Sequence, residues 1–342
     1  KEMIASILRQ QGSVLATRGN LNNDIGLPIT LTRLQDQDYA VIEMGANHAG
    51  EIGYLSNIAR PDVAVLNNAG RAHLEGFGSV EGVARAKAEI FNGLGEHGIC
   101  VFNADDDYAD LWRASCAGKT SISFGCSESA MVRGDSGNLA LHWSDTGFRS
   151  NFEVQSPAGS FTVSLQLAGR HNQMNALAAV AACMALDVDT ASIQAGLAAV
   201  APVPGRLCLL HGCNESWLID DSYNANPDSV SAAIEVLAAA PGSRILVLGD
   251  LGELGETELA LHAEIGRAAL AGGVQRLFTC GQLSEAASSS FGNNGQHFAD
   301  MEALVAALKG MVLAGDTVLV KGSRAAGMDR VVEALTRDET AC

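Results

Sequence analysis

The chain has 342 residues, of which 47% are hydrophobic, with 22 basic against 39 acidic side chains. This length allows two domains, each with a substantial core. The formal charge of −17 argues against a broad electrostatic surface for nucleic acid or an anionic membrane, so we expect neither as a partner. An anionic substrate would need local basic groups or metal ions.

The cysteines are scattered, without a C-x-x-C pair or histidines at zinc-ligand spacing. They are Cys100, Cys116, Cys126, Cys183, Cys208, Cys213, Cys280 and Cys342. This pattern is typical of reduced thiols rather than a disulfide framework. No apolar run approaches about 18 residues and no signal peptide opens the chain, so we expect a cytoplasmic protein.

The first half alternates short β-type runs with Ala-rich helical stretches, which favours a largely parallel α/β sheet. The chain opens on apolar residues at helical spacing with no cap before them, so we expect it to begin inside a helix whose preceding loop is missing. Strands are predicted at 39–45, 62–68 and 98–103, and helices at 80–94 and 172–186. Between Met131 and Leu167 polar and apolar residues alternate, which predicts antiparallel strands on the edge or face of that sheet.

Two prolines and a glycine interrupt the pattern in AAVAPVPGRL, residues 198–207. We therefore place a domain boundary there, with one domain at 1–205 and the other at 206–342. Four predicted strands follow, SWLID, RILVLGD, RLFTCG and DTVLVKG, each succeeded by a helix. That alternation predicts a Rossmann-like second domain.

Polar residues gather where these strands end, at the rim where open α/β sheets bind ligands. In the first half they are Glu43, Asn47, His48, Asn67, Asn68, Arg71, His73, Glu75, Asn103 and Asp105 to Asp107. In the second half they are Asp220, Asp221, Asp250, Glu253, Lys321, Ser323 and Arg324. The most polar run, DDSYNANPDS at 220–229, fits either a turn in which Asp228 or Ser229 caps the next helix or a ligand contact.

Ten segments, in chain order, resemble the Mur ligases of peptidoglycan synthesis. They are KEMIASIL, GNLNNDIGLPITL, DYAVIEMGANHAGEI, NNAGRAHLEGFGS, AKAEIF, GRHNQMNALAA, VPGRL, DDSYNANPDS, GDLGELG and VLVKGSRAAGMDRV. The resemblance implies a partial central ATP-binding domain at 1–205, a mostly parallel sheet with added antiparallel strands, and a Rossmann-like ligase domain at 206–342. In that family an ATP phosphate loop and a UDP-sugar-binding domain precede the opening helix, so the resemblance implies that both are missing here.

The resemblance also implies a reaction. A substrate carboxylate attacks the γ-phosphate of ATP to give an acyl phosphate, and an amine then displaces phosphate to leave an amide. The segments KGSRAAGMDRV and SYNANPDS favour the member that joins D-alanyl-D-alanine to UDP-N-acetylmuramoyl-tripeptide, acting as a monomer. The alternatives are a sister ligase that adds one amino acid, a folylpolyglutamate-type ligase, or a catalytically incomplete fragment. An oxidoreductase is disfavoured because no G-x-G-x-x-G follows any strand.

Carboxylate and triphosphate repel each other, so the first step needs magnesium. The resemblance makes Glu43 and His73 ligands of two Mg²⁺ ions and makes Lys87, as a carbamate formed with CO₂, a third metal-binding group. By itself, His73 is typical of a structural hydrogen-bonding residue, and Lys87 of a solvated helix face shared with Arg85 and Glu89. Because only a neutral lysine adds CO₂, the carbamate requires a lowered pKa of Lys87.

Nucleotide contacts are implied on both sides of the domain boundary. Asn172 and Asn175, one helical turn apart, would contact ATP; Arg206 would reach the phosphates as the second domain closes, and Asp221 the ribose hydroxyls. Tyr223 and Asn224 would lie toward the nucleotide or the domain interface, while Asn226 and Pro227 shape the turn into the next helix. The residues expected to face the dipeptide and the anionic end of the substrate are Asp250, Lys321, Ser323 and Arg324, although KGSR by itself is also typical of a plain solvated turn.

Overall fold

The computed structural model describes residues 1–135, 137 and 139–337 and divides into two compact units. The N-terminal unit comprises Lys1–Leu141, Arg149–Gln166 and Arg170–Ala201, and the C-terminal unit comprises His142–Phe148, Leu167–Gly169 and the chain from Pro202 onward. Seven cysteines are free thiols, and Cys342 lies outside the described residues.

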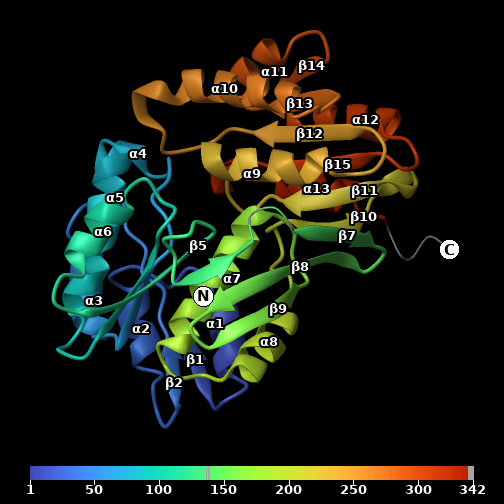
Figure 1. The fold of residues 1–342 in the computed structure, drawn as a ribbon. Helices are drawn as coiled ribbons and strands as arrows, with labels where there is room; N and C mark the ends of the chain where they lie inside the picture. Colours follow the sequence, from blue (N-terminus) through green and yellow to red (C-terminus); the bar gives the residue numbers. More distant parts are fainter. Residues whose placement is uncertain (136, 138, 338–342) are drawn as a thin grey trace. The chain divides into compact units, whose positions relative to one another are not determined.

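The strands up to residue 165 form two sheets (Figure 1). They are β1 (Val14–Ala16), β2 (Tyr39–Val41), β3 (Val63–Leu66), β4 (Ile99–Asn103), β5 (Thr120–Gly125), β6 (Val132–Gly134), β7 (Ala140–Ser144), β8 (Gly147–Ser156) and β9 (Gly159–Leu165). Strands β1 and β2 pair in parallel, as do β3 to β6, whereas β8 is antiparallel to β6 and β9. The predicted change from parallel to antiparallel strands is therefore confirmed.

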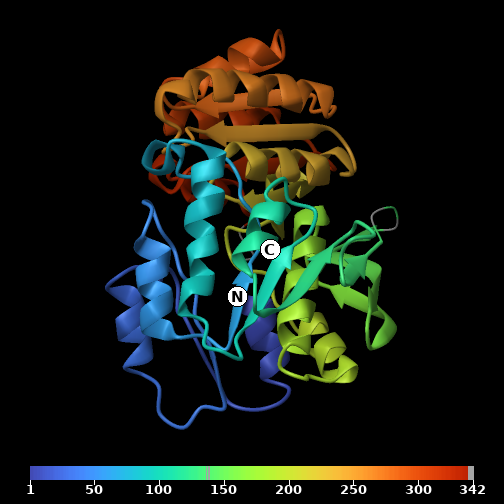
Figure 2. The same ribbon diagram turned by 60° about the vertical axis from the view of Figure 1, so that its left-hand side comes forward.

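Helices flank these strands. They are α1 (Glu2–Leu8), α2 (Gly26–Leu31), α3 (Glu51–Ala59), α4 (Leu74–Phe77), α5 (Val80–Ala88), α6 (Ala109–Ser115), α7 (Arg170–Met184) and α8 (Thr190–Ala198). Helices α3 and α5 lie side by side, in blue and cyan in Figures 1 and 2. Trp112 of α6 and Phe102 of β4 belong to a buried cluster with α5, and α7 packs against β3 to β6.

The helix predicted at 80–94 is shorter than expected. Helix α5 ends at Ala88 and continues as a 3-10 turn, η1 (Glu89–Gly93). Ser56 of α3 donates a 2.5 Å hydrogen bond to the Ile90 carbonyl, and a Cβ on Gly93 would lie 2.1 Å from the Ser56 carbonyl oxygen. This close contact with α3 occupies the carbonyl that would otherwise continue the α-helix.

The C-terminal unit contains a six-stranded sheet in the order β10-β11-β15-β12-β13-β14. Its strands are β10 (Cys208–His211), β11 (Trp217–Asp221), β12 (Arg244–Gly249), β13 (Arg276–Cys280), β14 (Gly295–Phe298) and β15 (Thr317–Lys321). The four predicted strands are β11, β12, β13 and β15, and all pair in parallel, which confirms the Rossmann-like prediction. The prediction omitted the short strands β10, which is antiparallel to β11, and β14.

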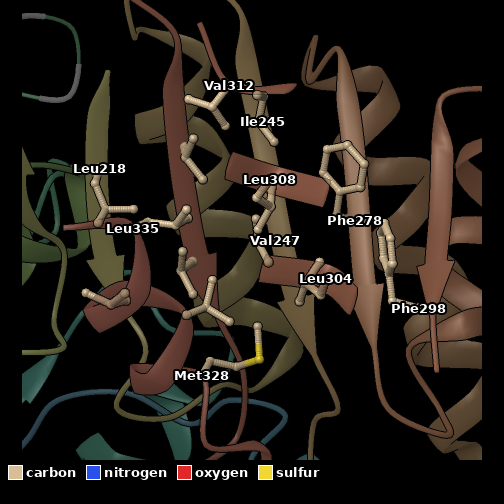
Figure 3. Close-up of a cluster of buried hydrophobic side chains, with 14 residues drawn as sticks. Leu218, Ile245, Val247, Phe278, Phe298, Leu304, Leu308, Val312, Met328 and Leu335 are labelled. Atoms are coloured by element: carbon tan, nitrogen blue, oxygen red, sulfur yellow. The ribbon is translucent and has the colours of Figure 1, made fainter. Parts of the chain in front are cut away.

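The helices of this unit are α9 (Pro227–Ala238), α10 (Glu258–Ala271), α11 (Glu285–Phe291), α12 (Met301–Met311) and α13 (Asp329–Leu335), with 3-10 turns η2 (Cys213–Glu215), η3 (Gly255–Thr257) and η4 (Arg324–Ala326). Leu304 and Leu308 of α12 pack against Val247 and Phe278 of the sheet, in a cluster that also includes Met328 (Figure 3). Within the described ranges, no helix is long and apolar enough to cross a membrane.

Helix α9 begins at a capping box. Asn226 Oδ1 accepts from the Ser229 N–H at 2.8 Å, and Ser229 Oγ accepts from the Asn226 N–H at 2.9 Å. The prediction that Asp228 or Ser229 caps the helix is therefore wrong, because both residues lie in its first turn. The N-cap of α9 is Asn226, and Pro227 is the first helical residue. A proline fits there because its missing N–H has no intrahelical partner at that position.

Candidate active site

Glu43 lies two residues beyond β2, where the chain leaves the β1 ladder. Its N–H donates to Thr17 Oγ1 at 2.9 Å, and its carboxylate accepts from Asn22 Nδ2 at 2.8 Å and lies 3.3 Å from Lys1 Nζ. The carboxylate is held in place yet 38% exposed, so it can still bind a cation from solvent.

His73 immediately precedes α4 and has a left-handed backbone with φ of 55°. A Cβ on Gly76 would lie 2.0 Å from the Asn47 carbonyl oxygen, so only glycine fits there. This approach places α4 directly against the segment that follows Glu43. Two of the predicted metal-binding residues thus lie on segments in contact.

Lys87 is separated from its charged helix neighbours. Arg85 pairs with Glu81 at 2.7 Å, and the Glu89 carboxylate accepts from the Gly50 N–H at 2.9 Å, whereas Lys87 Nζ donates to the Asn68 carbonyl at 2.7 Å. Burial lowers the pKa of Lys87, and the carboxylate of Asp106 partly opposes that shift. A lowered pKa is the direction of change that addition of CO₂ to a lysine requires.

The end of β3 connects Lys87 to the predicted nucleotide-binding residues. Asn67 Nδ2 donates to Asn175 Oδ1 at 2.7 Å, and Asn175 Nδ2 donates to Asn172 Oδ1 at 3.3 Å, so the expected shared face of α7 is confirmed. The next residue, Asn68, accepts from Lys87. Sequence reasoning placed Asn67 and Asn68 at the rim but gave them no role; their position after a central strand was the available signal.

Asp106 is a third residue whose role the sequence did not reveal. Its carboxylate accepts from the Ala69 N–H at 2.9 Å and the Tyr108 N–H at 3.0 Å. Burial raises the pKa of Asp106, against the effect of these hydrogen bonds and of Lys87. Asp106 therefore fixes the loop that runs from Asn68 toward His73.

The oxygen atoms of Glu43 and Asn67 suit a magnesium ion that is bound partly by water and phosphate better than a metal ion bound only by protein side chains. Across the described residues, no three His, Cys, Asp or Glu side chains are grouped as a metal site. Asn67 Oδ1 is buried and accepts no hydrogen bond from the described residues, and Glu43 is accessible. Mg²⁺ prefers one or two carboxylates together with water and phosphate oxygens, and these residues fit that pattern.

In the C-terminal unit, Asp221 and Lys321 form a buried ion pair. Lys321 Nζ lies 2.6 Å from Asp221 Oδ2 and donates to the Asn224 carbonyl at 3.0 Å, while the Leu207 N–H donates to Asp221 Oδ1 at 3.2 Å. Burial raises the pKa of Asp221, opposed by Lys321, and burial lowers the pKa of Lys321, opposed by Asp221. Both carboxylate oxygens of Asp221 are thus already hydrogen-bonded.

Asp250 has a similar internal role. Its Oδ1 accepts from the Leu283 N–H at 3.0 Å and the Ser284 N–H at 2.8 Å, and its carbonyl accepts from the Ser323 N–H at 2.8 Å. It therefore connects the ends of β12, β13 and β15. Exposed Arg324 follows and pairs with exposed Asp329 at 3.3 Å.

Known proteins match both halves of the chain. Residues 1–183 match the Mur ligase middle domain, and residues 205–324 match the domain described as Mur ligase, glutamate ligase domain. The UDP-N-acetylmuramoyl-tripeptide--D-alanyl-D-alanine ligase of Escherichia coli K12 is 46% identical over 343 residues, which cover 99% of this chain and 75% of that protein.

Solved structures agree with these matches. The crystal structure of MurF from Acinetobacter baumannii has a TM-score of 0.90 at 35% identity, covering 97% of this chain and 72% of that one. MurF ligase from Thermotoga maritima in complex with ADP has a TM-score of 0.84 at 30% identity, covering 98% and 75%. The chain, with both domain matches and this identity over nearly its whole length, belongs to the Mur ligase family.

Proposed function

We propose that this protein is an ATP-dependent ligase that joins D-alanyl-D-alanine to UDP-N-acetylmuramoyl-tripeptide in peptidoglycan precursor synthesis. The observation that carries the proposal is the 46% identity, over 99% of the chain, to a ligase of that name. The alternative of a sister ligase that adds one amino acid is not favoured by this similarity. The amide forms through an acyl phosphate, with ATP as the phosphoryl donor.

Glu43, His73 and Lys87 would hold magnesium in the N-terminal unit. The segment after Glu43 contacts the helix that follows His73 through Asn47 and Gly76, and Gly50 donates to Glu89 near the end of the Lys87 helix. Two Mg²⁺ ions, bound with ATP, would offset the repulsion between the substrate carboxylate and the triphosphate. The hydrogen bonds of Glu43 with Asn22 and of Lys87 with Asn68 would hold the surrounding loops in place before any ligand binds.

The Lys87 carbamate is part of the proposal. A neutral Lys87 amine forms a C–N bond with CO₂ and loses one proton, which leaves a carboxylate on the side chain. Burial of Lys87 supports this step because it lowers the pKa and so enlarges the neutral fraction. A cation thereby becomes an anion suited to Mg²⁺.

Residues of both domains, 1–205 and 206–342, would bind the other reactants. Asn172, Asn175, Arg206, Asp221, Tyr223 and Asn224 would form the ATP side, and Asp250, Lys321, Ser323 and Arg324 the dipeptide side. In this arrangement Asp221, Lys321 and Asp250 act largely by fixing backbone, because their polar atoms already accept or donate within the unit.

The test is phosphate release by the full-length enzyme from ATP, Mg²⁺ and UDP-N-acetylmuramoyl-tripeptide, with and without D-alanyl-D-alanine. We expect release that depends on the dipeptide. Lys87→Ala should lower kcat by about 100-fold or more, and a short-chain carboxylic acid should restore part of it. Lys309→Ala, which removes an exposed lysine of α12, is the matched control and should match wild type.

The outcomes separate the two parts of the proposal. Phosphate release that does not depend on the dipeptide but depends on a single amino acid would establish the sister ligase instead. If dipeptide-dependent phosphate release persists in Lys87→Ala, the carbamate role of Lys87 is refuted, whereas the proposed ligase reaction still holds.

A further inference from the structure

Two guanidinium groups lie over one tyrosine ring in the C-terminal unit. The Arg206 guanidinium carbon is 4.6 Å from the centroid of the Tyr223 ring, and that of Arg324 is 6.0 Å from the same centroid. Both distances are within the range of a cation–π interaction. The ring thus brings together an arginine near the domain boundary and an arginine that follows β15.

Hydrogen bonds hold the backbone of Tyr223 in place. The Tyr223 N–H donates to the Gly205 carbonyl at 3.0 Å, and the Gly205 N–H donates to Asp220 Oδ2 at 3.0 Å. Gly205 has φ of +76°, and a Cβ there would lie 3.0 Å from Tyr223 Cβ, so this approach requires glycine. The residue on the other side of Arg206, Leu207, is bound to Asp221. The backbone on both sides of Arg206 is therefore hydrogen-bonded, and the Arg206 guanidinium lies over the ring of a residue whose backbone is also held.

Among the described residues, only one of the two arginines at this ring has a carboxylate partner. No ion pair to Arg206 occurs within the part of the chain that the structure describes, and the pair of Arg324 with Asp329 is exposed and weak. The charge of Lys321 is matched by Asp221 at 2.6 Å. In a chain of formal charge −17, two arginines held together without a buried counterion form a local site for an anion.

We propose that Tyr223 is a positioning residue that holds Arg206 and Arg324 as a clamp for the phosphate chain of the nucleotide. This inference rests on the proposed ligase function and deepens it. A planar guanidinium presents two parallel donors to a phosphate, and a ring that fixes its plane reduces the entropy lost on binding. Tyr223 therefore acts through the arginines, in contrast to the expectation that it contacts the nucleotide itself. The same inference moves Arg324 from the dipeptide side to the phosphate chain.

A double-mutant cycle tests this role. Tyr223→Leu removes the ring and should raise both KM for ATP and the dissociation constant of ADP by about 2- to 30-fold, with kcat changed less. In an Arg206→Ala background the same substitution should raise both constants by a clearly smaller factor, because only Arg324, 6.0 Å from the ring centroid, is left for the ring to hold. Tyr223→Phe keeps the ring face and should restore most of the affinity. Tyr54→Leu, at a tyrosine 57% exposed on α3, is the matched control.

A second variant does not depend on the folding of Tyr223→Leu. Arg206→Lys keeps the charge but loses the planar group that lies over the ring, and it should weaken ADP binding although the charge is unchanged. Thermal unfolding of each variant shows whether it is folded.

Each contrary result has a distinct meaning. Equal effects of Tyr223→Leu in both backgrounds, or no rescue by phenylalanine, would show that Tyr223 does not act through Arg206. A raised KM for the UDP-linked substrate with ATP unaffected would overturn the assignment to the nucleotide. A wild-type enzyme without dipeptide-dependent phosphate release would instead refute the proposed function, whatever the cycle shows.

Discussion

Lys321 and Arg324 belong to one short segment, yet their side chains have different environments. The Lys321 side chain is 3% exposed and pairs with Asp221, whereas that of Arg324 is 66% exposed. Removing water from two charges is costly, and the pair is tolerated because the Leu207 N–H and the Asn224 carbonyl complete its hydrogen bonds. The pair therefore serves to fix the backbone around Arg206 and Asn224 more than to add stability.

Loss of one partner should be far more harmful than loss of both. Lys321→Met leaves the Asp221 carboxylate buried without its cation, so we expect the free energy of unfolding to fall by about 3–5 kcal/mol. Urea unfolding near neutral pH measures this, with Arg324→Met as the control, expected to cost less than about 1 kcal/mol. The double variant Asp221→Asn with Lys321→Met should recover much of the loss. A cost for Lys321→Met no larger than that of Arg324→Met would contradict the buried-pair interpretation.

Helix α3 shows how one element organises the loops around the candidate metal site. Its first residue, Glu51, accepts from the Asn47 N–H at 2.8 Å and the His48 N–H at 3.3 Å, and Glu89 accepts from the Gly50 and Gly53 N–H groups. Carboxylates are favoured at a helix N-terminus because the N–H groups there lack intrahelical partners. The two glutamates thus join α3, the segment after Glu43 and the end of α5.

The Glu51 contacts should make stability depend on pH. Hydrogen bonds from Asn47 and then His48 lower the pKa of Glu51 from its usual 4.5. A carboxyl whose folded pKa is depressed contributes stability above its unfolded pKa and loses it as the pH falls through the folded pKa. The Glu51 side chain is 46% exposed and its charge is screened by solvent, so near neutral pH Glu51→Gln should be less stable than wild type by at most about 0.3–1 kcal/mol, and the difference should vanish in acid.

Urea midpoints of both proteins across that pH range measure the effect. Glu128→Gln, in an exposed turn, is the control and should give a difference from wild type that does not change with pH. If the difference in urea midpoint between wild type and Glu51→Gln stays constant as the pH falls, the ionised carboxylate contributes no stability.

Each compact unit has its own buried cluster. Trp112, Phe91 and Phe102 pack in the N-terminal unit, while Met328, Leu304 and Val247 pack in the C-terminal unit. Separate cores are what independent domains require. The boundary between residues 205 and 206 remains a prediction that unfolding behaviour can test.

Met328→Ala should weaken the C-terminal unit selectively. Met328 is completely buried, so its truncation should cost about 2–5 kcal/mol through lost burial and a residual cavity. Hydrogen exchange measured by mass spectrometry should accelerate in peptides from β11, β12 and β15 and stay unchanged in β3 and β4. Met131→Ala, at a side chain 47% exposed, is the control. Equal acceleration in all of these strands would contradict a division into two domains at this boundary.

Local patterns were sufficient for much of the architecture. Short segments rich in apolar residues predicted β11, β12, β13 and β15, which are five or six residues long, and helical spacing placed Asn172 and Asn175 on one face. They failed for β10 and β14, which are only four residues long, and for the Asn226 cap. A four-residue strand is recognised only where its neighbours extend the β-type pattern, as they do around β3 (Val63–Leu66) within the predicted run 62–68.

The types of side chain at the candidate site could also be predicted from the sequence, because polar residues that follow the parallel strands of one sheet lie at the same edge of that sheet. The packing of strands and helices, however, decided which of these side chains are in contact. Lys87 is separated from Arg85 and Glu89 by contacts with Asn68, and Asp221 meets Lys321 across 100 residues of chain. Such pairs depend on how whole strands and helices dock, and the spacing of residues along one segment contains no information about that docking.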